Sequence, residues 1–205
     1  MDTTWLVSAV SILAAYLIGG IPWGVVAARV SGGPDPRGFG SGRTGGANVL
    51  RALGPRAAAI VGLLDLLKGS VAVLIPIILG APIETQALAV LAGIIGHSRS
   101  PFIGFRGGRG VSPAFGSVLV LWPLVALVIV PIFLGIVKFT RYSSIASLAS
   151  TALAGLILVG IVVVQHLPAG HLIYAIGGPA LIWLFHYDNI RRLLSGTERT
   201  IDARD

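Results

Sequence analysis

Long apolar runs alternate with short polar segments along the whole chain of 205 residues. A helix that crosses a bilayer needs about 20 predominantly apolar residues. The runs that approach or reach this length are Trp5–Val30, Ala57–Leu79, Ile145–Val164 and Leu172–Tyr187, and a shorter run covers about Thr85–Gly96. The pattern therefore predicts an all-α, polytopic integral membrane protein.

The apolar stretch Val111–Ile136 is open to two interpretations. A single helix over it would be about 40 Å long and would place Lys138 and Arg141 across the membrane from the other cationic residues. A hairpin of two short helices that turns near Trp122-Pro123 keeps all of these charges on one side, and proline breaks a helix interior. We predict about seven helices, two or three of them short; five full spans with a re-entrant pair is the alternative.

Charge follows the same alternation. The 15 Lys and Arg residues fall in every second polar segment, at Arg29–Arg56, Arg99–Arg109, Lys138–Arg141 and Arg191–Arg204, with Lys68 inside an apolar run. The segments between them, around Asp2, Gly80–Glu84 and Gln165–His171, contain none. Because cationic loops are retained in the cytoplasm, the N-terminus is expected outside and the C-terminus inside.

Composition narrows the class of protein. A chain that is 55% hydrophobic and 11% charged is too apolar for an ordinary soluble domain. The membrane accounts for the placement of the net charge of +7, so no nucleic-acid partner is expected, and without cysteine there is no disulfide. We expect one membrane-embedded domain over residues 1–205, a retained first helix, and a polar C-terminal segment from Thr197 that frays.

The first cationic loop, residues 35–51, is rich in glycine, with five glycines between positions 38 and 46. Glycine lets the backbone curl so that several N–H groups point at one site. The hydroxyls of Ser41 and Thr44 and the guanidinium groups of Arg43 and Arg51 add donors suited to phosphate. A flexible loop with its arginines at anionic lipid headgroups is the alternative.

The second cationic segment, residues 96–111, reads GHSRSPFIGFRGGRGV. Its RGGRG portion is expected to open a helix, and a helix N-terminus is itself a site for anions. His97 ends the preceding helix, where it is either a structural hydrogen-bonding residue or part of the site.

The third element is divided between Arg141–Ser144 and His186–Glu198. His186 and Asn189 are three residues apart, so they share a helix face. The neighbouring Arg191 and Arg192 are interpreted as cytoplasmic anchors.

Asp65 and Lys68 lie three residues apart inside an apolar run. An ionisable pair within the membrane suggests function. A self-neutralising structural pair near the inner boundary is the alternative.

Together the patterns G-S-G-x-x-G-x-x-N-x-x-R, G-H…F-x-G-G-x-G-V and H-x-x-N-I-x-R-L…G-x-E resemble the bacterial membrane glycerol-3-phosphate acyltransferase family that uses acyl phosphate. The resemblance covers essentially the whole chain. It implies transfer of a fatty acyl group from acyl phosphate to the 1-hydroxyl of glycerol 3-phosphate, giving lysophosphatidic acid. It also implies a monomer in the inner membrane of a bacterium, with its active site facing the cytoplasm.

The resemblance implies site residues as well. His97 and Ser41 would be catalytic, and substrate or phosphate would be bound by Gly40, Gly42, Arg43, Gly45, Asn48, Arg51, Gly107, Gly108, Arg109, Ser143, Ser144, His186 and Asn189. The chain departs from the usual family pattern in having Arg43 for Asn, Gly46-Ala47 for Ala-Thr and Arg109 for Lys.

The chemistry of the implied reaction agrees with these residues. Two phosphate-bearing substrates repel in a site of low dielectric constant, so fixed cations and N–H groups are needed, and Arg43, Arg51, Arg106 and Arg109 are candidates. The chain has no G-x-S-x-G nucleophile elbow, which favours direct attack without a covalent enzyme intermediate, and no metal or cofactor is expected. A non-catalytic relative that binds glycerol phosphate or anionic lipid, or a small transporter, is the alternative.

Overall fold

The computed structural model describes residues 4–202, which fold into a helical bundle with no strand among them. Proline and glycine residues interrupt the apolar runs, and most helices begin or end next to one of them. The helices in chain order are α1 (Thr4–Gly20), α2 (Trp23–Ser31), η1 (Pro36–Gly38), α3 (Gly46–Leu53), α4 (Pro55–Ile78), α5 (Ile83–Ser98), η2 (Pro101–Ile103), α6 (Val111–Leu121), α7 (Pro123–Thr140), α8 (Ser143–Val164), α9 (Gly170–Phe185) and α10 (Tyr187–Leu194).

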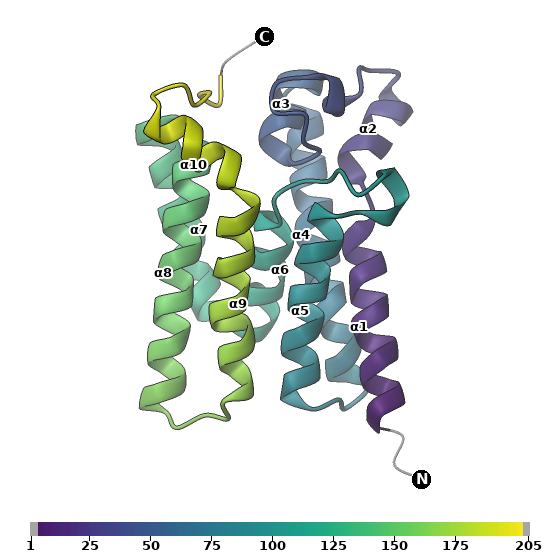
Figure 1. Ribbon diagram of the computed structural model, residues 1–205, viewed down its shortest axis with the longest axis vertical. Helices are drawn as coiled ribbons and strands as arrows, with labels where there is room; N and C mark the ends of the chain where they lie inside the picture. Colours follow the sequence, from purple (N-terminus) through teal and green to yellow (C-terminus); the bar gives the residue numbers. More distant parts are fainter. Residues whose placement is uncertain (1–3, 203–205) are drawn as a thin grey trace.

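The long helices run up and down in turn, so their connections gather at two ends of the bundle (Figure 1). α1 packs on α4 and α5, α4 on α6, α5 on α9, and α8 on α7 and α9. Segments 32–54, 99–110 and 140–142 meet at one end, called here the cationic end, together with α10. The described Lys and Arg side chains belong to this end except Lys68, which is buried within α4. The predicted one-sided distribution of charge is confirmed with that exception.

The predicted break at Trp122-Pro123 is also confirmed. α6 ends at Leu121 and α7 begins at Pro123, so the interpretation of this stretch as one long helix is wrong. The indole Nε1 of Trp122 donates a hydrogen bond to the hydroxyl of Tyr174 on α9, which fixes the turn of the hairpin.

The first apolar run, Trp5–Val30, is divided into two helices by a break that was not predicted from the sequence. α1 ends and α2 begins on either side of Ile21-Pro22, because proline has no N–H to donate and its ring clashes with the preceding turn. The freed carbonyl of Gly20 accepts a hydrogen bond from Ser100 Oγ at 2.6 Å, and that of Ile21 accepts one from Lys68 Nζ at 2.7 Å. Side chains from two other segments therefore supply the hydrogen-bond donors that these two carbonyls lack within the helix.

Close packing of α4 on α6 depends on glycine. A side chain on Gly69 would overlap the backbone of Pro113, and one on Gly116 would overlap the backbone of Leu66. The two helices therefore approach at backbone distance, and the hydroxyl of Ser117 donates to the Gly69 carbonyl at 3.1 Å. This contact fixes the start of α6 relative to α4, on which the site depends.

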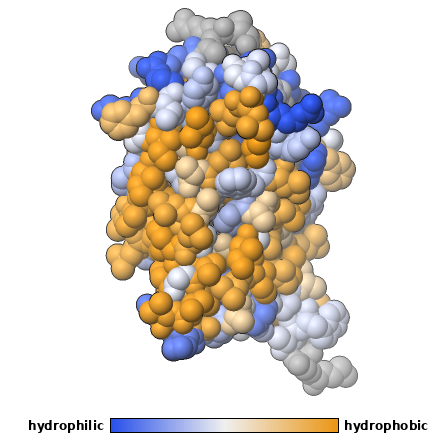
Figure 2. Space-filling model, turned by 60° about the vertical axis from the view of Figure 1, so that its left-hand side comes forward, coloured by the Kyte–Doolittle hydropathy of each residue, from blue (hydrophilic) through white to orange (hydrophobic). Residues whose placement is uncertain are grey.

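On the face shown in Figure 2, apolar side chains cover the bundle between its two polar ends. Large exposed hydrophobic side chains lie on most of the long helices, among them Leu13, Leu63, Leu127, Leu156 and Ile176. By length and composition, Thr4–Ser31 (α1 with α2), α4, α7 and α8 can each cross a membrane, whereas α6 and α9 are shorter apolar helices. A surface of this kind is stable in lipid rather than in water.

Candidate active site

A cavity of about 450 Å³ lies at the cationic end, lined in part by the α3–α4 corner and by α7. The two glycine-rich segments, the start of α8 and the α9–α10 junction complete its walls. Of the residues predicted for the site, those that line it are Ser41, Arg43, Gly45, Asn48, His97, Gly108, Arg109, Ser143 and His186. Segments separated by up to 160 positions, those of Ser41 and Ile201, thus meet around one space.

The first turns of α3, α6 and α8 line this cavity. α3 contributes Gly46 and Ala47, α6 contributes Val111 and Ser112, and α8 contributes Ser143. The first N–H groups of a helix lack partners within the helix and carry the positive end of its dipole. The prediction that the RGGRG segment opens a helix is confirmed, because α6 follows it directly. Converging helix N-termini make the cavity favourable for an anion.

Arg43 and Arg109 reinforce this preference. They line the cavity, and among the described lining residues there is no Asp or Glu. Burial, together with the positive charges of Arg43 and Arg192, lowers the pKa of Arg109 to about 10, so the guanidinium stays charged at neutral pH. Its Nε is buried without an acceptor among the described residues. A bound anion would relieve the repulsion between these cations and supply that acceptor.

Arg51 and Arg106 are placed differently and do not line the cavity. Arg51, on α3, donates from Nη2 to the carbonyl of Thr200 at 2.8 Å, while Arg106 is exposed on its loop. The lining thus contains two of the four arginines proposed as phosphate ligands.

Asn48 organises the first glycine-rich loop from inside. Its amide nitrogen donates to the carbonyls of Pro36, Phe39 and Arg43, and its oxygen accepts from the backbone N–H of Ser41 at 3.2 Å. Because the amide has only two hydrogens, these contacts occupy its donors fully. Asn48 touches the cavity, yet its observed contacts shape the loop that carries Ser41 and Arg43.

Gly40, Gly42 and Gly107 lie behind the lining and contribute backbone geometry. Gly40 and Gly42 have φ of 45° and 65°, in the left-handed region that favours glycine. A side chain on Gly107 would overlap the carbonyl of His97; its N–H donates to the carbonyl of Ser98 at 3.1 Å.

His97 lies near the end of α5, with its ring in the cavity wall. Its carbonyl accepts from the N–H of Gly108 at 3.0 Å, so the second glycine-rich segment folds back onto this helix end. A Cβ on Gly108 would overlap Nε2 of the His97 ring. The absence of a side chain at position 108 therefore makes room for the imidazole.

His186 joins α9 to α10 and also lines the cavity. Its Nδ1 lies 2.8 Å from the carbonyl oxygen of Ile182. A carbonyl only accepts, so Nδ1 carries the proton and Nε2 is left as an acceptor. Burial and the positive charge of Arg109 lower the pKa of His186 to about 4, which keeps the ring neutral at neutral pH.

Ser144 and Asn189 are buried and lie outside the cavity lining. The amide of Asn189 donates to the Glu198 carboxylate, which also pairs with Nε of Arg192 at 2.8 Å. Burial alone would raise the pKa of Glu198, but these hydrogen bonds hold it below its ordinary value. Arg192, interpreted from the sequence as an anchor, is thus ion-paired within the protein.

The chain after α10 reaches the cavity through Ile201. The N–H of Ile201 donates to the carbonyl of Arg141 at 2.7 Å, and Asp202 pairs with the Arg141 side chain. The expectation that the tail frays is wrong for residues 197–202, while 203–205 lie outside the described residues. The C-terminal contacts were missed because a short polar tail has no periodic pattern.

The apolar part of the lining was also missed. Phe133, Leu134 and Val137 of α7 line the cavity, as do Leu50, Ala58 and Ala59 of α3 and α4. Ser112 and Ser147 were likewise not among the predicted residues but line the cavity. In sequence, the apolar residues of a membrane helix look alike whether they face lipid or a cavity. Of the lining residues that were missed, only Ser112 could have been found from its sequence neighbours, because it lies beside the RGGRG segment.

Comparisons with known proteins agree with this arrangement. A family model described as glycerol-3-phosphate acyltransferase matches residues 9–196. Glycerol-3-phosphate acyltransferase 3 of Dehalococcoides mccartyi (strain CBDB1) is 35% identical, and the match covers 94% of this chain and 95% of that protein. Glycerol-3-phosphate acyltransferase 1 of Deinococcus radiodurans is 38% identical, and the match covers 97% of this chain and 98% of that protein. Crystal structures of PlsY (YgiH), an integral membrane glycerol 3-phosphate acyltransferase, superimpose with TM-scores of 0.85 in the glycerol 3-phosphate form and 0.83 in the lysophosphatidic acid form. Each is 38% identical and covers 94% of both chains.

Proposed function

The chain belongs to the glycerol-3-phosphate acyltransferase family, and from that premise we propose that it transfers a fatty acyl group from acyl phosphate to the 1-hydroxyl of glycerol 3-phosphate. The products are lysophosphatidic acid and inorganic phosphate. The whole chain acts as one membrane-embedded unit and needs no cofactor or partner subunit.

One observation carries the proposal: the lining of one cavity combines anion-binding groups with apolar side chains. The anion-binding groups are Arg43, Arg109 and the helix N-termini, and the apolar side chains include Phe133, Leu134 and Val137. A phosphate-bearing acyl donor and a phosphorylated alcohol together require this combination. Relatives solved with glycerol 3-phosphate and with lysophosphatidic acid support the same substrate classes.

The phosphate groups bind to the anion-binding groups in this proposal. Arg109 supplies a half-buried guanidinium whose Nε is buried, Arg43 a partly exposed one, and the N-termini of α3 and α6 supply backbone N–H groups. A charge-assisted hydrogen bond contributes about 1.5–3 kcal/mol, so each such bond offsets part of the repulsion between the two phosphates.

The glycerol hydroxyls are oriented by uncharged groups. His186 offers Nε2 as an acceptor because its Nδ1 faces the carbonyl of Ile182. The hydroxyls of Ser41 and Ser143 lie in the same lining and can donate or accept.

The acyl tail lies along the apolar wall. Phe133, Leu134 and Val137 of α7 and Ala58 and Ala59 of α4 supply this apolar lining. Both helices also carry exposed apolar side chains such as Leu134 and Leu63, so in this proposal the tail of a donor already in the bilayer enters beside them.

The reaction requires no covalent enzyme intermediate. The 1-hydroxyl oxygen attacks the acyl carbonyl carbon, the bond from that carbon to the phosphate oxygen breaks, and phosphate leaves. The hydroxyl proton passes to His97 or to a substrate phosphate. Arg43, Arg109 and the helix N-termini stabilise the negative charge that develops, so positioning and electrostatics supply most of the rate enhancement.

The orientation in the membrane follows from the cationic end. Positively charged loops are retained on the cytoplasmic side, so this end faces the cytoplasm of a bacterium, the N-terminus faces outward and the inner membrane is crossed seven times. Cysteines at Gly80 and at Gly196, labelled with an impermeant reagent in intact cells, test this. Labelling of Gly196→Cys but not of Gly80→Cys would contradict the orientation.

The function is tested with purified protein by measuring phosphate release from a long-chain acyl phosphate and glycerol 3-phosphate. Release that depends on both substrates, with no transfer from acyl-coenzyme A or acyl carrier protein, is the expected result and should survive EDTA. Transfer from one of the other donors would contradict the proposed donor. Binding of glycerol 3-phosphate without turnover would identify a non-catalytic relative, and flux through reconstituted vesicles without transfer a transporter.

A further inference from the structure

The last described residues of the chain, 200–202, form a short segment at the cationic end, called here the strap (Figure 1). The family model ends at residue 196, so the match to the family assigns the strap no role. One of its residues, Ile201, is half-buried and lines the cavity. The contacts that hold the strap in place indicate what it does.

The chain that leads into the strap is fixed to α10. The N–H of Thr197 donates to the carbonyl of Arg192 at 2.8 Å. The Glu198 carboxylate accepts from the Asn189 amide and, at 2.8 Å, from Nε of Arg192. These contacts fix the position at which the strap begins.

The strap itself is joined to two different parts of the cavity wall. The carbonyl of Thr200 accepts from Nη2 of Arg51 on α3 at 2.8 Å. The N–H of Ile201 donates to the carbonyl of Arg141, between α7 and α8, at 2.7 Å, and Asp202 pairs with the Arg141 side chain. α3 packs on α4, whereas α7 packs on α6 and α8. The strap therefore bridges parts of the wall that have different packing partners, and Ile201 lies between the two attachments.

A site that holds acyl phosphate has to keep water from it. Water can attack the acyl carbon as the glycerol hydroxyl does: its oxygen bonds to that carbon, and the bond from the carbon to the phosphate oxygen breaks. Fatty acid and phosphate then leave, each with one hydrogen of the water. Closure of an active site prevents such hydrolysis. An apolar residue held at the cationic end, where the cavity is nearest to water, suits this task.

We propose that the strap completes the active site and that Ile201 is a specificity-determining residue, which keeps water from the acyl carbon so that glycerol 3-phosphate is the acceptor. This role rests on the proposed acyl transfer. Thr200 and Asp202 are positioning residues that hold Ile201 in the cavity wall. A tail that only stabilises the fold could be removed without changing the choice between the two acceptors, whereas the strap could not.

The first test measures how acyl phosphate is divided between transfer and hydrolysis. Lysophosphatidic acid and free fatty acid are quantified in one reaction at saturating glycerol 3-phosphate, after subtraction of the hydrolysis that occurs without protein. Ile201→Ala should raise the ratio of fatty acid to lysophosphatidic acid about 10-fold, the lower end of the effect of altering an apolar contact in a pocket. A chain that ends at Arg199 should raise this ratio at least as much.

The matched control is Leu194→Ala, an exposed apolar residue of α10 outside the cavity lining, which should keep the wild-type ratio. Because the ratio compares two fates of one donor in one sample, inactive unfolded protein lowers both products and leaves the ratio unchanged. A wild-type ratio in Ile201→Ala or in the shortened chain would overturn the proposal, as would an equal rise in Leu194→Ala.

The second test does not depend on turnover. The chain has no cysteine, so Ile201→Cys places a single thiol in the cavity wall, and Ser195→Cys places one at an exposed position outside the lining. Glycerol 3-phosphate or inorganic phosphate should slow the labelling of Ile201→Cys by a small maleimide but not that of Ser195→Cys. Labelling of Ile201→Cys that neither ligand slows would overturn the proposal.

The two proposals can fail separately. If no donor supports acyl transfer in the wild-type protein, the proposed function fails, while protection of Ile201→Cys from labelling still decides whether the strap belongs to the site. If transfer occurs but removal of the strap leaves the ratio of the two products unchanged, the proposed function stands and the role of Ile201 is lost.

Discussion

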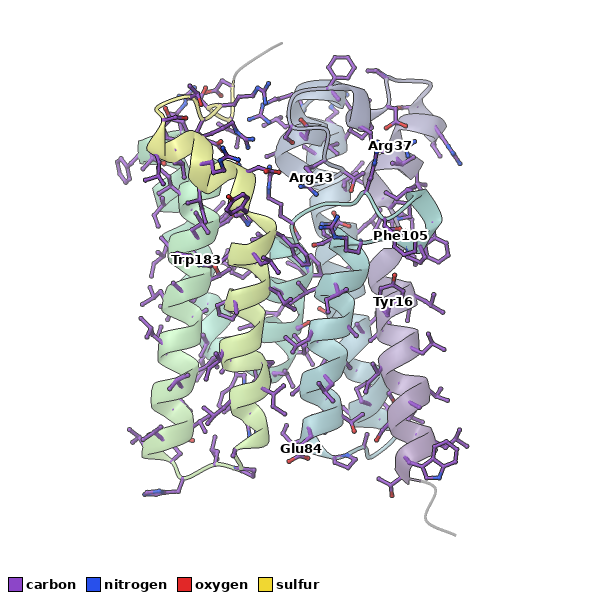
Figure 3. All side chains as sticks on the ribbon, viewed as in Figure 1. Tyr16, Arg37, Arg43, Glu84, Phe105 and Trp183 are labelled. Atoms are coloured by element: carbon purple, nitrogen blue, oxygen red, sulfur yellow. The ribbon has the colours of Figure 1, made fainter. Side chains whose placement is uncertain are left out.

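Arg43 and Asp188, 145 positions apart in the chain, join the first glycine-rich loop to α10 by an ion pair with Nη2 3.3 Å from Oδ2. Arg43 lies at the cationic end where that loop faces α10 (Figure 3). The Asp188 side chain is 56% exposed, and an exposed pair contributes only about 0–1 kcal/mol. A guanidinium–phosphate bond within the cavity is stronger, at about 1.5–3 kcal/mol. Phosphate should therefore displace Asp188 from Arg43.

Arg43→Gln should raise KM for glycerol 3-phosphate about 10-fold or more, because a charge-assisted bond is lost, while kcat changes less. Asp188→Asn removes the competing carboxylate and should leave KM unchanged or lower it by up to about fivefold. Steady-state phosphate release measures both. Arg37→Gln is the matched control, because Arg37 pairs with Asp35 outside the cavity lining. A rise of KM in Asp188→Asn equal to that in Arg43→Gln would mean that the pair holds the loop rather than competing with substrate.

Two proline breaks show how far the sequence predicts the fold. The break at Pro123 was predicted because an uninterrupted helix would have moved Lys138 and Arg141 across the membrane. The equivalent break at Pro22 was missed, since the cationic residues stay on one side with or without it. The carbonyls of Gly20 and Ile21 at this break accept hydrogen bonds from Ser100 and Lys68. Because these partners are distant in sequence, no local pattern indicates the break.

The residues of the site likewise fall into those that the sequence predicts and those that depend on tertiary packing. Residues with distinctive chemistry, such as Ser41, His97 and His186, were predicted and lie around one cavity. The apolar wall at Phe133 and the contact of Ile201 were not predicted, because both depend on tertiary packing of residues with no local signature.

Asn48→Asp should destabilise the protein rather than alter substrate affinity alone. The new carboxylate is isosteric but cannot donate to the carbonyls of Pro36, Phe39 and Arg43. At about 1 kcal/mol for each net hydrogen bond, the loss of the two amide hydrogens costs about 2 kcal/mol, visible as a lower thermal unfolding midpoint in detergent. Ser41→Ala, in the same loop, should lower kcat without changing that midpoint. A wild-type midpoint for Asn48→Asp, combined with a raised KM, would instead assign the amide to phosphate.

Gly108→Ala should lower kcat about 100-fold, the effect of displacing a reacting group by roughly 1 Å. The added methyl group would overlap Nε2 of His97, so the imidazole must move. Gly38→Ala is the control, because a Cβ there meets no atom within 4 Å. Turnover in both variants is compared after checking that their unfolding midpoints match the wild type. Equal activity of Gly108→Ala and wild type would show that the position of His97 is unimportant for turnover.

Acidification should destabilise the fold through His186. Burial and the charge of Arg109 lower the pKa of this histidine to about 4 in the folded protein, against about 6.5 in an unfolded chain. Between these values the unfolded state binds more protons, so stability is complete above about pH 6.5 and is lost as the pH falls toward 4. At pH 5 the loss is about 2 kcal/mol.

His186→Gln removes this contribution, so its unfolding midpoint should fall less than that of the wild type between pH 7 and pH 5. The range above pH 5 is chosen because Glu198, whose folded pKa lies below its ordinary value, affects stability only at lower pH. His171→Gln, near the start of α9 at the end of the bundle away from α10, is the control for loss of a histidine outside the cavity lining. If the unfolding midpoints of the wild type and His186→Gln fell equally with pH, His186 would have the same pKa in the folded and unfolded states. That result would contradict the proposed role of His186 as a neutral acceptor for a substrate hydroxyl.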